Sequence, residues 1–85
     1  MKQLTIYTLK GCPYCIRAKR TLDELNLTYT EIDTDLDTPE MEALTKNTSS
    51  DTLPQIFVGE EFIGGSDDLT LLVSSGKFLA MLKKA

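Results

Sequence analysis

The feature that most constrains this chain is the segment from Lys10 to Cys15, which contains both of its cysteines, spaced C-x-x-C. It stands directly after a strand-like stretch and directly before a helix-like one. The first N–H groups of a helix lack internal partners and carry partial positive charge. A thiolate at Cys12 would lie against these groups, with the Lys10 ammonium nearby. Both effects favour the thiolate over the thiol.

Two neighbours of Cys12 support a dithiol that cycles between reduced and oxidised forms. Pro13 suits the first helical position, where a missing N–H costs nothing. Cys15 lies one turn further along, shielded but close enough to form a small disulfide with Cys12. The segment therefore predicts a redox-active cysteine pair.

Three other interpretations of the pair compete with redox chemistry. Structural zinc needs four nitrogen or sulfur ligands, and this chain has no further cysteine and no histidine, so we expect no metal. A purely structural disulfide would close a very small loop and stabilise little. Chance spacing of two core cysteines is the weakest interpretation. We therefore prefer the redox interpretation.

Composition limits the other classes of function. With 85 residues, the chain is expected to form a single domain over 1–85. A net charge of −4 without a basic cluster argues against nucleic acid and membrane surfaces, and no stretch approaches the ~20 apolar residues of a membrane span. Three cations that follow the cysteines are expected on a solvated helix face: Arg17, Lys19 and Arg20. Because the N-terminus runs straight into a strand, we expect no leader peptide and a cytoplasmic location. We also expect a monomer, because the redox pair uses both cysteines and leaves none to link two chains.

Hydrophobic patterning predicts the order β-α-β-α-β-β-α. The expected strands span 4–8, 28–32, 55–58 and 61–63, and the first helix spans 13–27, with Asn26 as its candidate end. The second helix is expected to begin at Thr38-Pro39 and to end in the polar run 47–51. The last begins with Ser66 or Asp67 as its cap and is interrupted at Gly76. A cysteine pair beside a βαβ unit is typical of a thioredoxin-like α/β fold, with a small four-stranded mixed sheet flanked by helices on both faces.

Thr52-Leu53-Pro54 opens the third expected strand. Proline cannot donate to a sheet ladder, so its position there needs a reason. Position alone favours a trans proline at a strand start. The Thr-apolar-Pro context and the cysteine pair upstream favour instead a cis bond that turns the Leu53 backbone outward, toward an extended peptide.

The run Gly64-Gly65-Ser66-Asp67-Asp68 leads from a glycine turn into a helix. Free N–H groups at that helix start can bind a carboxylate, and the Asp67 carboxylate can bind an ammonium group. Together these groups would recognise the head of an α-amino acid. Ordinary capping by Ser66 and Asp67 is an equally common interpretation and does not exclude the first.

These three segments resemble the signature segments of dithiol glutaredoxins, particularly the short bacterial type. The matching runs are Cys12-Pro13-Tyr14-Cys15, Thr52-Leu53-Pro54-Gln55-Ile56-Phe57 and Gly64-Gly65-Ser66-Asp67-Asp68-Leu69. The resemblance covers essentially the whole chain in order and spacing. Cys-Pro-Tyr-Cys distinguishes it from the Cys-Gly-Pro-Cys of thioredoxins and from single-cysteine glutaredoxins that carry iron–sulfur clusters.

The resemblance implies a glutathione-dependent thiol–disulfide oxidoreductase. In that family pattern Cys12 attacks a protein disulfide or a protein–glutathione mixed disulfide, and Cys15 resolves the protein-bound intermediate. Two glutathiones, kept reduced by glutathione reductase, regenerate the dithiol, and ribonucleotide reductase is one acceptor that the family serves. The implied glutathione contacts are Lys10, Tyr14, Thr52, Leu53, Pro54, Ser66 and Asp67.

Two departures from the family pattern keep alternatives open. Met41 stands where many relatives place an Arg or Gln that binds the glycine carboxylate of glutathione, and Asp51 lies in a segment that is often basic. Lys10 or Lys46 could substitute for the missing group. Weaker glutathione binding would favour a redoxin reduced by a thioredoxin-type reductase. An iron–sulfur carrier, its cluster bridging two subunits through Cys12 and glutathione, is a third hypothesis, which Pro13 disfavours.

Overall fold

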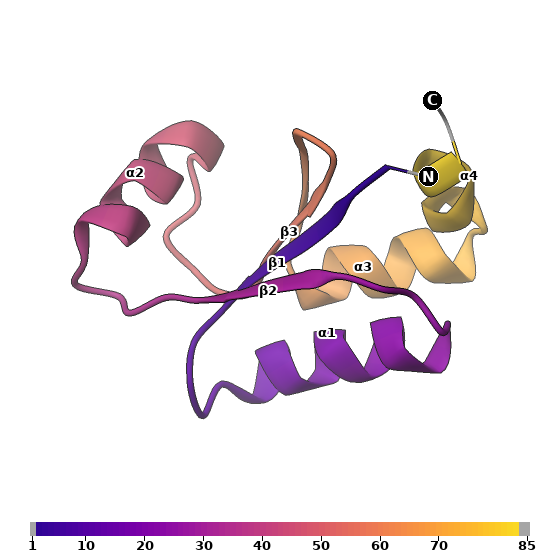
Figure 1. Cartoon of the computed structure of the whole chain (residues 1–85), viewed down its shortest axis with the longest axis horizontal. Coiled ribbons are helices and arrows are strands. Elements are labelled where there is room, and N and C mark those ends of the chain that lie inside the picture. Colours follow the sequence, from indigo (N-terminus) through magenta and orange to yellow (C-terminus); the bar gives the residue numbers. More distant parts are fainter. Residues whose placement is uncertain (1, 84–85) are drawn as a thin grey trace.

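The computed structural model describes residues 2–83 as eight elements joined by short connections (Figure 1). In chain order they are β1 (Leu4–Thr8), α1 (Pro13–Glu24), β2 (Thr30–Asp33), α2 (Pro39–Thr48), β3 (Gln55–Val58), β4 (Glu61–Gly64), α3 (Ser66–Ser74) and α4 (Lys77–Lys83). This order confirms the predicted one, with the expected break in the last helix at Gly76, where φ is +78°.

The four strands form one mixed sheet in the order β2-β1-β3-β4. β1 and β2 are parallel and are connected through α1, whereas β3 pairs antiparallel with both β1 and β4. β1 and β3 are therefore the central strands, with β2 on one side and β4 on the other. This position carries the end of β1, and the cysteines that follow it, to one edge of the sheet.

Helices cover both faces of the sheet, as predicted, but to unequal depths. Alternate residues of β1 and β3 face α1, α3 and α4 in the larger cluster of buried residues: Leu4, Ile6, Ala18, Leu22, Ile56, Val58, Leu69, Phe78 and Leu82. On the opposite face α2 contributes Met41 and Leu44, which pack with Phe57 of β3. Figure 1 shows α2 apart from the other three helices.

The first helix ends, and the second strand begins, at different residues from those expected. α1 ends at Glu24 rather than at residue 27, because Asn26 adopts a left-handed conformation with φ of 57°. Asparagine tolerates that conformation better than most residues. β2 begins at Thr30 rather than at residue 28, since its pairing with β1 starts at Thr5 opposite Thr30.

The cap of α3 also differs from the prediction. The N-cap is Gly65, not Ser66 or Asp67, and the Asp68 side chain accepts a hydrogen bond of 3.0 Å from the Gly65 N–H. By contrast, Thr38 caps α2 as expected, because its hydroxyl oxygen accepts from the Met41 N–H at 3.2 Å.

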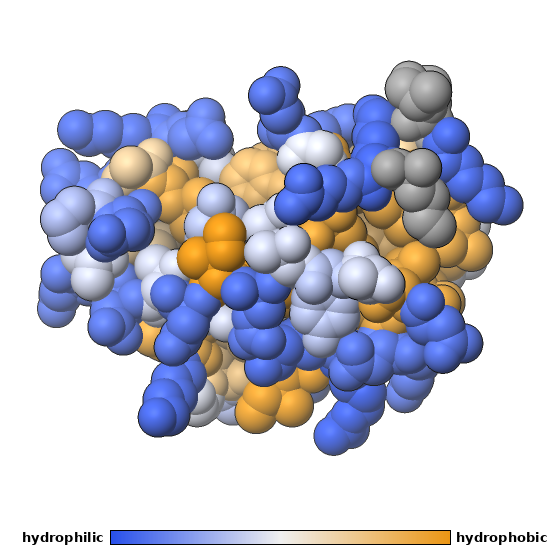
Figure 2. All heavy atoms as spheres, in the orientation of Figure 1, coloured by the Kyte–Doolittle hydropathy of each residue, from blue (hydrophilic) through white to orange (hydrophobic). Residues whose placement is uncertain are grey.

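The surface in Figure 2 is mostly hydrophilic along its edges, with smaller hydrophobic areas between. Within residues 2–83, no helix combines the length and the apolar character needed to cross a membrane.

Candidate active site

Cys12 occupies the N-cap of α1, where a tight turn places it. The turn closes through a hydrogen bond of 3.1 Å from the Cys12 N–H to the Leu9 carbonyl, and Gly11 supplies a φ of +78° that other residues rarely adopt. The Cys12 sulfur accepts a hydrogen bond from the Cys15 N–H at 3.2 Å. A free N–H at the start of α1 thus points at the sulfur, as the sequence predicted.

Cys15 lies in the first turn of α1 and is 1% exposed. Its sulfur accepts from the Leu9 N–H at 3.5 Å. Burial, followed by a hydrogen bond with Cys12, raises the pKa of the Cys15 thiol to about 12. The two cysteines therefore differ in exposure: Cys12 is partly exposed, whereas Cys15 is buried. The raised pKa of Cys15 keeps that thiol protonated.

The loop before β3 carries the second segment to Cys12. The Leu53–Pro54 bond is cis, as the sequence context predicted, and the Leu53 carbonyl oxygen lies 3.8 Å from the Cys12 sulfur, whose S–H donates to it. The fully buried Gln55 side chain holds this loop. Its amide nitrogen donates to the carbonyls of Ser50 (2.8 Å) and Thr52 (3.1 Å).

The third segment forms the start of α3, where Ser66 is 5% exposed. Among the residues that the structure describes, its hydroxyl oxygen is the buried side-chain oxygen or nitrogen that lacks a hydrogen-bond partner. Buried hydroxyls are normally paired, so an unpaired hydroxyl at the start of α3 is an unusual feature of this site. Asp67 beside it is exposed.

One groove collects most of the residues that the sequence singled out. Its lining includes six predicted ligand contacts: Tyr14, Thr52, Leu53, Pro54, Ser66 and Asp67. Ser50 and Phe62 also line it, and the sequence analysis did not select either as a contact. Phe62 lies on β4 and reaches the groove only through the pairing of Phe57 with Phe62, so no local sequence signal identified it.

Lys10 is the exception among the predicted contacts. It is exposed and lines a separate hollow with Cys15, Lys19 and Glu31, outside the groove. Of the three cations expected on a solvated helix face, Lys19 is partly buried, and its ammonium group lies 3.0 Å from the Glu31 carboxylate with the side chain 30% exposed. Arg17 lies over the Tyr14 ring, with its guanidinium carbon 5.5 Å from the ring centre.

Met41, the main departure from the family pattern, is a buried member of the small cluster on the α2 face. It lines a third hollow with Asp51 and Lys46. The Lys46 ammonium lies 3.6 Å from the Glu42 carboxylate on the same helix. The candidate substitute for the missing cation therefore already has an acidic neighbour.

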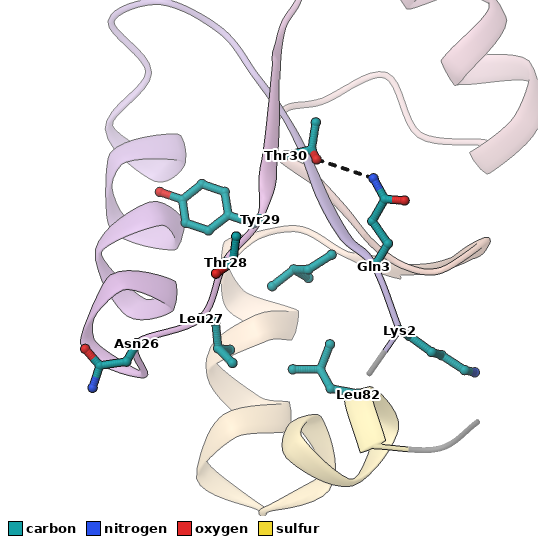
Figure 3. Close-up of a pocket in the computed structure, with 9 residues that line it drawn as sticks. Lys2, Gln3, Asn26, Leu27, Thr28, Tyr29, Thr30 and Leu82 are labelled. Atoms are coloured by element: carbon teal, nitrogen blue, oxygen red, sulfur yellow. Dashed lines mark hydrogen bonds between the residues drawn. The ribbon is translucent and has the colours of Figure 1, made fainter.

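A further pocket lies at the other end of α1, next to α4 (Figure 3). Leucine, threonine and amide side chains dominate its lining, and Gln3 donates to the Thr30 hydroxyl across it at 3.3 Å. Neither cysteine lines it, and we assign no redox chemistry to it. Within 2–83, no group of three or more His, Cys, Asp or Glu side chains is arranged to hold a metal ion.

A cysteine pair at the junction of a central strand and a helix, beside a cis-proline loop, defines a thiol–disulfide oxidoreductase with a thioredoxin-like fold. A family model described as Glutaredoxin matches residues 4–63. The chain is 45% identical over 83 residues to a glutaredoxin of Pseudomonas aeruginosa, with 96% of this chain and 98% of that protein covered.

Solved structures agree with this match. The solution structure of a glutaredoxin from Brucella melitensis is 42% identical, with a TM-score of 0.83 over 98% of this chain and 90% of that one. A buckwheat glutaredoxin–glutathione complex is 31% identical, with a TM-score of 0.84 over 95% of this chain and 76% of that one. This chain belongs to the glutaredoxin family and is a glutathione-dependent thiol–disulfide oxidoreductase.

Proposed function

We propose that Cys12 is the nucleophile of this oxidoreductase and Cys15 its resolving thiol. The observation that carries this assignment is the contrast between the two sulfurs. Cys12 is partly exposed and accepts an N–H of α1 at 3.2 Å, whereas Cys15 is 1% exposed. A substrate disulfide can reach the first sulfur, and the second is reached only from Cys12 itself.

The proposed reaction has two steps on a protein disulfide. The Cys12 thiolate attacks one sulfur, so that a mixed disulfide forms and the other substrate sulfur leaves as a thiolate. Cys15 then loses its proton and attacks the Cys12 sulfur. The Cys12–Cys15 disulfide forms as the second substrate thiolate leaves, and two glutathiones reduce it. With a glutathionylated protein, Cys12 alone exchanges with the glutathione sulfur.

We propose that glutathione binds along the groove beside Cys12. The Leu53 backbone would pair with the cysteinyl residue, with Thr52, Pro54 and Tyr14 alongside. The unpartnered Ser66 hydroxyl and the α3 N-terminus would bind the γ-glutamyl carboxylate, and Asp67 its ammonium group. The buckwheat glutaredoxin–glutathione complex supports this proposal by its similarity to the chain. Lys10 lies outside the groove, in a separate hollow, so a contact with glutathione would need its side chain to reach across from there.

The further parts of the proposal concern partners and location. We propose one domain over 1–85, acting as a cytoplasmic monomer on disulfide-containing or glutathionylated proteins, with ribonucleotide reductase as one acceptor. A relative matched over 98% of its own length supports the single domain. A free dithiol suits a reducing compartment.

The test is reduction of a glutathione mixed disulfide, coupled to NADPH through glutathione and glutathione reductase. We expect turnover by the wild type, no turnover by Cys12→Ser, and retention of much of the rate by Cys15→Ser. Activity in Cys12→Ser would overturn the assignment of the nucleophile. A wild type that is inactive here but accepts electrons from a thioredoxin reductase would favour the second hypothesis, with Met41 as its structural reason.

A further inference from the structure

A hollow lies beside the resolving cysteine, separate from the glutathione groove. Cys15, Lys19, Glu31 and Thr8 line it, together with Lys10 and Asp33. These six include the charged groups that share the hollow with Cys15 within the described part of the chain. The function proposed above uses Cys15 and Lys10 among them and leaves the other four unexplained.

Three of these side chains form a fixed network. The Lys19 ammonium donates to one carboxylate oxygen of Glu31 at 3.0 Å, and the Thr8 hydroxyl donates to the same oxygen at 2.9 Å. Thr8 is 2% exposed, so its side chain is held by packing. These two hydrogen bonds lower the pKa of Glu31, which keeps it ionised and able to hold Lys19.

The fold places this network against Cys15 for two reasons. Lys19 follows Cys15 by four residues on α1, so their side chains share one face of the helix. Glu31 lies opposite Ile6 in the β1–β2 pairing and therefore points, like Ile6 and Thr8, toward the face that α1 covers.

The groups around Cys15 act on it in opposite directions. Burial, the hydrogen bond with Cys12 and the charge of Cys12 raise the pKa of the Cys15 thiol, whereas the Leu9 N–H and Lys19 lower it. Once Cys12 is part of a mixed disulfide, it no longer carries a thiolate charge. Burial then remains as the opposing effect, and Lys19 and the Leu9 N–H remain as the groups that favour the Cys15 thiolate.

We propose that Lys19, held by Glu31 and Thr8, is a positioning residue for the resolving step, where it stabilises the Cys15 thiolate that attacks the mixed disulfide. The proton of Cys15 passes to solvent as this thiolate forms. The new Cys12–Cys15 bond replaces the bond from Cys12 to the substrate sulfur, which leaves as a thiolate. This inference rests on the roles proposed for Cys12 and Cys15.

Ellman's reagent, an aromatic disulfide, separates the two steps in one experiment. Attack by Cys12 releases one coloured thiolate at a rate that depends on reagent concentration. Attack by Cys15 releases a second at a rate that does not. Stopped-flow absorbance of the reduced protein would follow both releases across a range of pH. The variants are Lys19→Gln, Lys19→Arg and, as a matched loss of charge from the same helix, Arg20→Gln.

We expect Lys19→Gln to slow the second release roughly fivefold near neutral pH, the size expected for one nearby charge. It should also move the rise of that rate to higher pH and leave the first release within about twofold of wild type. Lys19→Arg should restore the second release, and Arg20→Gln should leave both unchanged.

Three outcomes would overturn the inference. The second release could be unchanged in Lys19→Gln at every pH. It could be slowed equally in Arg20→Gln, or the first release could be slowed as much as the second. Cys12→Ser separates this failure from failure of the proposed roles. If that variant still releases the first coloured thiolate at the wild-type rate, the roles of the cysteines are wrong. If it loses that release while Lys19→Gln behaves as wild type, only the role of Lys19 fails.

Discussion

At the scale of single residues, the two thiols of one turn have different surroundings. The Cys12 sulfur lies at the helix N-terminus and contacts the Leu53 carbonyl. Cys15 is buried against the hollow that contains Lys19 and Glu31. Two identical side chains are therefore expected to differ in reactivity, because one lies at the helix N-terminus and the other is buried.

Alkylation measures this difference directly. We expect iodoacetamide, added to the reduced protein near pH 8, to modify Cys12 and to leave Cys15 largely unmodified. Cys15 is buried and its pKa is raised to about 12, so both access and the thiolate fraction are small. Mass spectrometry of proteolytic fragments after a short exposure would locate the label. Equal labelling of both cysteines would contradict the burial of Cys15, and unfolded protein supplies the control in which both react.

The raised pKa of Cys15 also predicts how stability depends on pH. The ordinary value is 9.0 and the folded value is about 12. Below pH 9 the thiol is protonated in both states, and its contribution to stability is fully present. Between pH 9 and 12 the unfolded chain ionises this thiol and the folded protein does not, so the free energy of unfolding falls as pH rises. Urea denaturation of the reduced wild type should therefore lose stability over that range faster than Cys15→Ser. Parallel curves would show that the environment of Cys15 is misjudged.

At the scale of elements, the site depends on the turns and loops that connect helices to strands. The turn from β4 into α3 leaves no space for a side chain at Gly64. Gly64 has a φ of +116°, and a Cβ there would overlap the Asp68 side chain, which accepts from the Gly65 N–H. This junction combines a backbone conformation that favours glycine with no space for a side chain.

Gly64→Ala and Gly76→Ala separate these two requirements. Gly76 also has a positive φ, +78°, but a Cβ there would meet nothing within 4 Å. We expect Gly76→Ala to cost about 1–2 kcal/mol of stability, the cost of the backbone conformation. Gly64→Ala should cost more, and it should also raise the KM for glutathione because it displaces the groove lining. Equal losses in urea denaturation would argue against the steric component.

The loop before β3 depends on one buried amide. The Gln55 side chain donates to two carbonyls of this loop, and its oxygen accepts from the Thr48 hydroxyl at 2.9 Å. Gln55→Leu leaves these groups unpaired, and we expect a loss of about 2 kcal/mol or more. Gln3→Leu is the control, because the Gln3 residue is exposed and its side chain donates a hydrogen bond of 3.3 Å to the Thr30 hydroxyl. Thermal or urea denaturation would compare them, and a Gln55→Leu protein as stable as Gln3→Leu would contradict this role.

The sequence predicted elements better than it predicted contacts between them. Alternating residues identified β1, and the cap at Thr38 identified the start of α2, because these signals are local. The pairing of Lys19 with Glu31 depends on the register of β1 with β2. The position of Lys10 depends on the turn at Gly11. Such contacts join distant parts of the chain, and a single sequence carries no local signal for them.

At the scale of the whole molecule, the sheet separates two layers of unequal depth. The larger cluster joins three helices to β1 and β3, whereas α2 is held through Met41, Leu44 and their contacts with Phe57. Tyr7, Leu53 and Phe62 pack partly against this smaller cluster. It therefore links α2 to the groove, through Leu53 and Phe62.

The difference in size between the two clusters predicts that α2 opens locally more easily than the rest of the fold. Because α2 packs in the smaller cluster and not in the larger one, its amides should exchange with deuterium through local opening, at a lower free energy than amides of β1 and β3. Met41→Ala removes a buried side chain of the small cluster, and we expect it to speed exchange in α2 by about tenfold or more. Exchange in α1 should change only as far as global stability falls. Leu22→Ala, in the large cluster, is the matched control and should speed exchange throughout the described elements. If Met41→Ala instead accelerated α1 and α2 equally, the two layers would open as one unit, and binding at the groove could not be coupled to α2 alone.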